Sequence, residues 1–182
     1  MDLYETDGYR SAIMKGKESF EELETYIDLY LIHSPHHPYE RIGMYRGLEE
    51  LQRQGIVKSI GVSNFGVKHL QELLDSPETS VVPAVNQVEI HPFLLRNDIE
   101  EFCAAHGIVV QAYSPLAKAK RMDDETINAI AGGHGVSVAQ VGFVTVAYGT
   151  VYCMVGVHGF PAEALVRNWL KSLVLRVICP NI

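Results

Sequence analysis

The feature of this sequence that most constrains its fold is a repeated alternation between short apolar runs and longer amphipathic segments. The apolar runs are Tyr26–Ile32, Ser59–Val62, Ala84–Ile90 and Ile108–Tyr113. Each run is too short for a helix and too continuously apolar for a strand with one solvated face. The pattern therefore predicts strands that are buried on both faces.

The segments between these runs have helical periodicity. Residues 39–55 collect four apolar side chains on one helical face and end at a terminating glycine, Gly55. Those four side chains are Ile42, Tyr45, Leu48 and Leu51. Residues 67–76 and 97–107 show the same pattern, and Asn97 is the expected N-cap of the second. Strands alternating with helices predict a parallel α/β sheet.

Polar side chains follow every predicted strand, and this distinguishes two parallel architectures. They are His33, Ser63, Asn64, the segment from Gln87 to His91, Tyr113 and Ser114. A closed barrel gathers all its strand ends at one mouth, whereas a doubly wound sheet concentrates them at one switch point beside a glycine-rich turn. The sequence contains no GxGxxG. We therefore predict a TIM-type (β/α)8-barrel.

The predicted barrel is incomplete, because a full barrel of this type has about 250 residues and the sequence has 182. A fifth strand is expected at Val151–Val157, followed by an amphipathic helix at 162–175. Ahead of Tyr26 there is room for one helix, at 8–24. We expect residues 1–182 to form one partial barrel domain.

Composition narrows the expected environment and partners. The net charge of −7 argues against nucleic acid or an anionic membrane as the main partner. The three cysteines show no CxxC or disulfide spacing, which favours a reducing, cytoplasmic location. No apolar run reaches the length of a membrane span, and no signal pattern opens the chain. No residue pattern specifies an oligomeric state.

Four motifs, YIDLYLIHSP, SIGVSNF, NQVEIHP and QAYSPLA, occur in this order from Tyr26 to Ala117. In order and spacing they resemble the aldo-keto reductase family, and the close match runs over residues 8–141, with 142–182 divergent. The resemblance implies a (β/α)8-barrel that reduces aldehydes and ketones to alcohols with NADPH, and a small-molecule carbonyl compound as the substrate.

The resemblance also assigns roles to the strand-end residues. A histidine at a barrel mouth can donate a hydrogen bond to a carbonyl oxygen, and His33 matches the histidine of the family's catalytic tetrad. Neutral amide and hydroxyl groups suit an uncharged carboxamide, and Ser63, Asn64 and Gln87 match the residues that hold the nicotinamide carboxamide.

The predicted cofactor site continues after the fourth strand. An aromatic ring can stack on the flat nicotinamide, and Tyr113 matches the family's stacking residue. Ser114 and Leu116 match the start of the loop that covers the pyrophosphate. No metal is expected, because His36, His37 and His91 have no carboxylate at ligand spacing.

Two departures from the family leave two functions open. The other tetrad members, an aspartate, a tyrosine and a lysine, have no counterpart here, and Tyr4 and Tyr9 are not equivalents. The family's Lys-Ser phosphate pair is replaced by Val155-Gly156. One interpretation is a carbonyl reductase whose sequence is incomplete. The alternative is a catalytically inactive truncated remnant that at most binds nucleotide or a protein partner.

Overall fold

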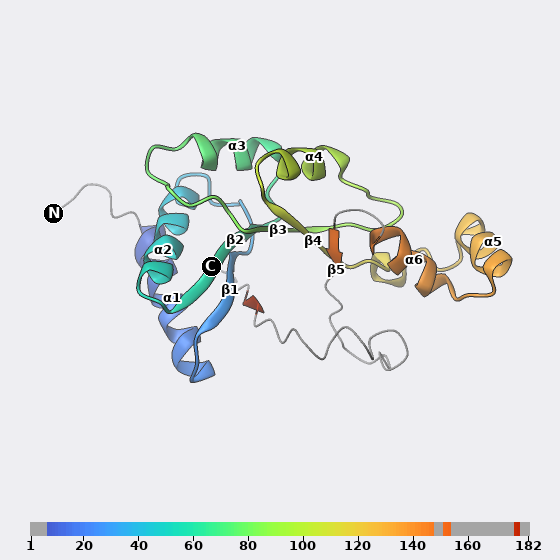
Figure 1. The fold of residues 1–182 in the computed structure, drawn as a ribbon, viewed down its shortest axis with the longest axis horizontal. Coiled ribbons are helices and arrows are strands. Elements are labelled where there is room, and N and C mark those ends of the chain that lie inside the picture. Colours follow the sequence, from blue (N-terminus) through green and yellow to red (C-terminus); the bar gives the residue numbers. More distant parts are fainter. Residues whose placement is uncertain (1–6, 148–150, 154–176, 179–182) are drawn as a thin grey trace. The chain divides into compact units, whose positions relative to one another are not determined.

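The computed structural model describes residues 7–147, 151–153 and 177–178, which fall into two compact units. The first unit contains residues up to Ala84 together with the short strand at 177–178, and the second contains residues from Val85 onward to 153. Figure 1 shows the elements of both units along the chain. Each unit is an arrangement of parallel strands and helices.

The described residues of the first unit form three helices and three strands. They are α1 (Asp7–Leu23), β1 (Ile27–Ile32), α2 (Arg41–Arg53), β2 (Val57–Ser63), α3 (Val67–Asp75) and β6 (Val177–Ile178). β1 lies between β2 and β6 and is parallel to both. The β1–β2 register runs from Ile27 opposite Val57 to Ile32 opposite Val62, so the two strands end side by side.

The helices α1 and α2 pack closely against each other in this unit (Figure 1). Three of the four residues of the predicted apolar face of α2, Tyr45, Leu48 and Leu51, are fully buried, and Ile42 is half-buried. Gly47 on the same helix lies so close to α1 that it leaves no room for a side chain. The helix ends before Gly55, which has the positive φ of 75° expected of a terminating glycine.

In the second unit, the part of the chain that the structure describes forms three parallel strands, three α-helices and one 3₁₀ turn. They are β3 (Val85–Glu89), α4 (Asn97–Ala105), β4 (Val109–Tyr113), η1 (Ala117–Ala119), α5 (Glu125–His134), α6 (Val138–Ala147) and β5 (Val151–Cys153). β4 is parallel to β3 on one side and to β5 on the other.

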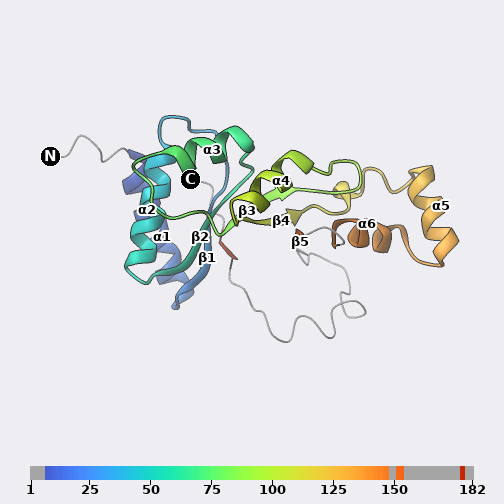
Figure 2. The ribbon, with the colours of Figure 1, turned by 45° about the horizontal axis from the view of Figure 1, so that its top comes forward.

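Burial alternates along β3 and β4, which gives the second unit's sheet two different faces, so the predicted burial on both faces is wrong for these two strands. Asn86, Val88, Val110 and Ala112 are buried on the face that α4 covers (Figure 2). The amide of Asn86 donates to the sulfur of Cys103 on α4 at 4.0 Å. Burial raises the pKa of the Cys103 thiol to about 11, so it is protonated at neutral pH and is not a nucleophile.

The predicted α/β class with parallel strands is confirmed. Three of the four predicted strands agree with the structure to within one residue at either end, and β2 begins two residues before the predicted Ser59. Strand β5 confirms the first three residues of the fifth predicted strand. The rest of that predicted strand, residues 154–157 with Val155 and Gly156, lies outside the described residues. The helix expected at 162–175 also lies outside them.

One predicted helix cap is wrong. The N-cap of α4 is Arg96 rather than Asn97, and Asn97 is already helical. The chain enters the helix through a tight turn in which His91 and Leu94 exchange main-chain hydrogen bonds, and Arg96 has a φ of 58°. This left-handed entry places the start of the helix one residue earlier than the side-chain preference of asparagine indicates.

Candidate functional site

Asn64 joins the ends of β1 and β2. Its side-chain nitrogen Nδ2 donates to the main-chain oxygen of His33 at 2.9 Å and to Ser63 Oγ at 3.2 Å. The backbone of Asn64 is left-handed, with φ at 61°, a conformation that asparagine tolerates better than most residues. Ser63 is buried, while the His33 side chain is exposed. The first unit therefore brings His33, Ser63 and Asn64 together at the ends of two adjacent strands.

Arg41 links the loop after β1 to α3. Its Nη1 donates to the main-chain oxygen of Pro35 at 3.1 Å, and its Nε donates to the carboxylate of Glu72 at 3.0 Å. A second guanidinium nitrogen, Nη2, contacts the same carboxylate. The Arg41 side chain is 12% exposed and that of Glu72 is 41% exposed, so the guanidinium is shielded from water while the carboxylate stays screened by it. The pair holds the segment that follows His33 against α3.

His69 caps the start of α3. Its ring nitrogen Nδ1 accepts a hydrogen bond from the main-chain N–H of Gly66 at 3.2 Å. The ring also meets the buried ring of Phe65 edge-on, with centroids 5.9 Å apart. Burial and the nearby Arg41 lower the pKa of His69. No sequence pattern indicated His69, because a histidine at this position does not match the Glu or Gln of a standard capping box. None indicated Arg41 either, because its partner Glu72 is 31 residues away along the chain.

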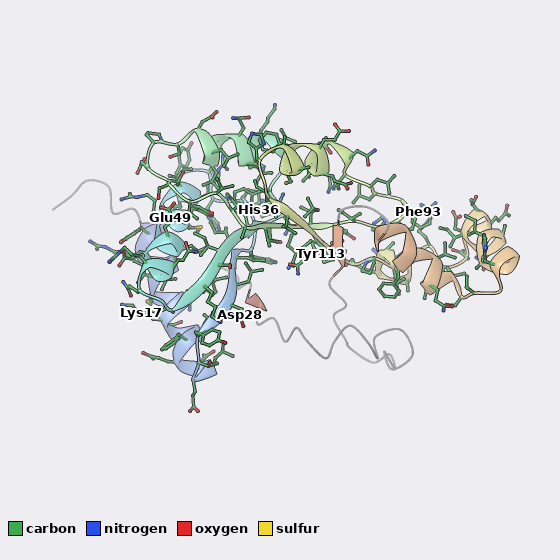
Figure 3. All side chains as sticks on the ribbon, in the orientation of Figure 1. Lys17, Asp28, His36, Glu49, Phe93 and Tyr113 are labelled. Carbon is green, nitrogen blue, oxygen red and sulfur yellow. The ribbon has the colours of Figure 1, made fainter. Side chains whose placement is uncertain are left out.

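In the second unit, Gln87 and Tyr113 lie on one face of the sheet. Gln87 is opposite Gln111 in the β3–β4 register and donates to its side-chain oxygen at 2.8 Å. Tyr113 ends β4 opposite Glu89 and is partly exposed (Figure 3). Both side chains are on the face opposite the one that α4 covers. The ring of Tyr113 is therefore not part of the buried core of this unit.

The loop after Tyr113 has an unusual backbone. Ser114, Ala117, Lys118 and Ala119 all have φ between 49° and 59°. Left-handed conformations in residues other than glycine cost on the order of 1 kcal/mol or more each, and such strain often occurs at functional sites. The loop packs on α6, since a Cβ added at Gly142 would lie 3.1 Å from Leu116 Cδ2. Ser114 and Leu116 are thus held in a defined, tightly turned loop.

The described residues contain no group of three or more His, Cys, Asp or Glu side chains that could hold a metal ion. Within the same part of the chain, no helix has both the length and the apolar character needed to cross a membrane.

Comparison with known proteins places this arrangement in a family. The sequence profile of the aldo/keto reductase family matches residues 4–157. Glyoxal reductase of Bacillus subtilis is 42% identical over 138 residues, covering 75% of this chain and 49% of the relative. Methylglyoxal reductase DkgA of Escherichia coli K12 is 38% identical over 128 residues, covering 68% of this chain and 46% of the relative.

Solved structures are also similar to this chain. The crystal structure of an aldo/keto reductase from Brucella melitensis matches with a TM-score of 0.73 and 34% identity, over 80% of this chain and 56% of that one. An aldo-keto reductase from a deep-sea metagenome matches with a TM-score of 0.76 and 31% identity, over 85% of this chain and 57% of that one. The chain spans about half the length of the curated relatives it matches. On the profile match and these likenesses, the chain belongs to the aldo/keto reductase family.

Proposed function

We propose that this chain carries the nicotinamide side of an NADPH-dependent carbonyl reductase. In the reaction, hydride passes from the reduced nicotinamide to the carbonyl carbon of an aldehyde or ketone, and a proton added to the oxygen completes the alcohol. Members of this family generally use NAD(P)H and act on small carbonyl compounds. The relatives named glyoxal reductase and methylglyoxal reductase support a small, reactive dicarbonyl as the substrate class.

The observation that carries this proposal is the hydrogen bond from Asn64 to the main chain of His33. It supports a site in which the His33 imidazole, for polarising a carbonyl, and the Asn64 side chain, for binding the nicotinamide carboxamide, lie at the ends of adjacent strands. In this proposal His33 orients and polarises the substrate carbonyl. Ser63 and Asn64 hold the nicotinamide carboxamide, which decides which face of the ring meets the substrate.

The second unit carries the other residues that the family resemblance assigns to cofactor binding. Gln87 provides a further amide for the carboxamide, and the partly exposed ring of Tyr113 stacks on the nicotinamide. Ser114 and Leu116 begin the loop that covers the pyrophosphate, and the tight backbone of this loop supports a built binding element. We propose that both units belong to one barrel domain of a cytoplasmic protein, with close family character over residues 8–141.

A second candidate function is nucleotide or protein binding without turnover. It is favoured by the sequence, in which Val155-Gly156 stands where the family has its Lys-Ser phosphate pair. Each charge-assisted contact to a phosphate contributes about 1.5–3 kcal/mol, so losing two would weaken NADPH binding by roughly a hundredfold or more. This candidate predicts no oxidation of NADPH.

One set of measurements separates these candidates. NADPH oxidation by the purified chain is followed at the absorbance band of the reduced nicotinamide, with methylglyoxal or 4-nitrobenzaldehyde as substrate, and binding is measured separately by calorimetry. The reductase proposal expects turnover that falls by about 10²–10⁴ in His33→Ala and is unchanged in His134→Ala, an exposed histidine at the end of α5. Binding without turnover supports the second candidate. An absence of both refutes NADPH as the ligand.

A further inference from the structure

The first turn of α3 holds a histidine whose role the proposed chemistry does not include. The helix begins after Gly66, which has no side chain with which to cap the helix. The N–H of Gly66 donates to Nδ1 of His69 at 3.2 Å. Because Nδ1 accepts this bond, the neutral ring carries its proton on Nε2. His69 thus does for Gly66 what Glu or Gln does in a capping box.

This cap lies two residues from Asn64 along the chain. Between them, the buried ring of Phe65 packs edge-on against His69. His69 therefore holds the segment after Asn64 in two ways, through the Gly66 N–H and through the Phe65 ring. Asn64 itself has a left-handed backbone, which asparagine tolerates but adopts only in a minority of cases, so neighbouring contacts help to fix it. The cap of α3 supplies part of that support.

The charges around His69 favour its neutral form. Arg41 on α2 and His36 in the loop after β1 disfavour the imidazolium, while Glu72 on α3 favours it. Burial acts in the same direction as Arg41 and His36, and the pKa of His69 is lowered overall. Arg41 is itself hydrogen-bonded to Glu72, and its positive charge offsets much of the effect of that carboxylate on the histidine. The ring is therefore set up to accept a hydrogen bond at neutral pH.

We propose that neutral His69 is a positioning residue for Asn64, and that protonation of His69 releases the loop between β2 and α3 and weakens NADPH binding. An imidazolium carries hydrogen on both ring nitrogens and cannot accept the Gly66 N–H. Protonation would also place a second positive charge beside Arg41. The inference rests on the proposed function in one respect, since it takes Asn64 as a ligand of the nicotinamide carboxamide.

The structural part of the inference is tested by NMR on the whole chain, without cofactor. The Gly66 amide and the Asn64 side-chain amide should shift with pH along the same curve as the His69 ring. In His69→Gln, which keeps an acceptor that does not titrate, both signals should stay close to their high-pH positions. Signals of Gly66 and Asn64 that ignore the His69 titration would overturn the inference.

The functional part is tested by calorimetric titration with NADP⁺, which is stable in acid, at about pH 8 and at a pH below the midpoint that the NMR titration gives for the His69 ring. His69→Leu should bind about fivefold more weakly than wild type at the higher pH, the loss expected for a missing helix cap. His69→Gln should retain wild-type affinity there. His134→Gln, at an exposed position on α5, serves as the matched control.

The decisive quantity is the difference between wild type and His69→Gln as the pH falls, because the 2′-phosphate of the cofactor itself titrates near pH 6. Wild type should lose about fivefold more affinity than His69→Gln. Parallel curves for the two proteins would overturn the coupling between His69 and cofactor binding. If no variant binds NADP⁺ at about pH 8, the proposed function fails, and the NMR titration alone decides whether His69 positions Asn64.

Discussion

A methyl group at Gly47 would test how closely α1 and α2 must pack. An ideal Cβ at this position would lie 2.7 Å from Ala12 Cβ and 2.8 Å from the main-chain oxygen of Tyr9. Neither atom is the end of a flexible side chain, so the two helices would have to move apart. Glycine to alanine inside a helix ordinarily stabilises a protein by about 0.5–1 kcal/mol, whereas overpacking a core costs about 1–3 kcal/mol. Gly47→Ala should therefore lower the free energy of unfolding by about 1–2 kcal/mol.

Urea denaturation followed by far-ultraviolet circular dichroism measures this change. The matched control is Gly132→Ala in α5, where no described atom lies within 4 Å of the added Cβ. The control should gain about 0.5–1 kcal/mol from helix propensity alone. If Gly47→Ala is as stable as wild type or gains as much as the control, the close approach of α1 and α2 is refuted.

Three other substitutions test single contacts. Tyr45→Phe should raise the free energy of unfolding by about 1 kcal/mol, because the buried hydroxyl has no hydrogen-bond partner in the described part of the chain. Burial raises the pKa of Tyr45, so its ionisation opposes folding. Above about pH 10, the free energy of unfolding should fall more steeply with pH in wild type than in Tyr45→Phe. Equal slopes in urea denaturation at a series of pH values would contradict the burial of the Tyr45 hydroxyl. Glu49→Gln should lower the free energy of unfolding by about 1 kcal/mol, because Oε1 of Glu49 accepts hydrogen bonds from the N–H groups of Ser80 and Val81, both at 2.7 Å. An unchanged free energy of unfolding would mean that the carboxylate charge contributes nothing. Asp124→Ala should speed amide exchange in α5 by about fivefold, since Asp124 accepts from the first-turn N–H groups at 3.1 and 3.2 Å, and Asp124→Asn should restore it.

The residues alone determined the strands and most helix ends. A parallel strand covered on both faces requires a continuous apolar run, and the run ending at Ile32 located β1 for this reason. The run ending at Tyr113 located β4 as closely, although burial alternates along that strand. Gly55 and Gly107 marked helix ends because both have the positive φ that glycine adopts without steric cost. The same local patterns placed His33 and Asn64 after their strands, where parallel pairing brings them together.

Tertiary structure decided the contacts that position those residues. The bond from Asn64 to the main chain of His33 joins positions 31 residues apart, and so does the ion pair of Arg41 with Glu72. No local periodicity encodes which side chain meets which across such a separation. The cap of α3 by His69 and the left-handed entry of α4 at Arg96 also depended on neighbouring loops rather than on intrinsic preference. Local sequence sets where the backbone can be helical or extended, whereas packing between distant segments selects the hydrogen bonds that hold a site in place.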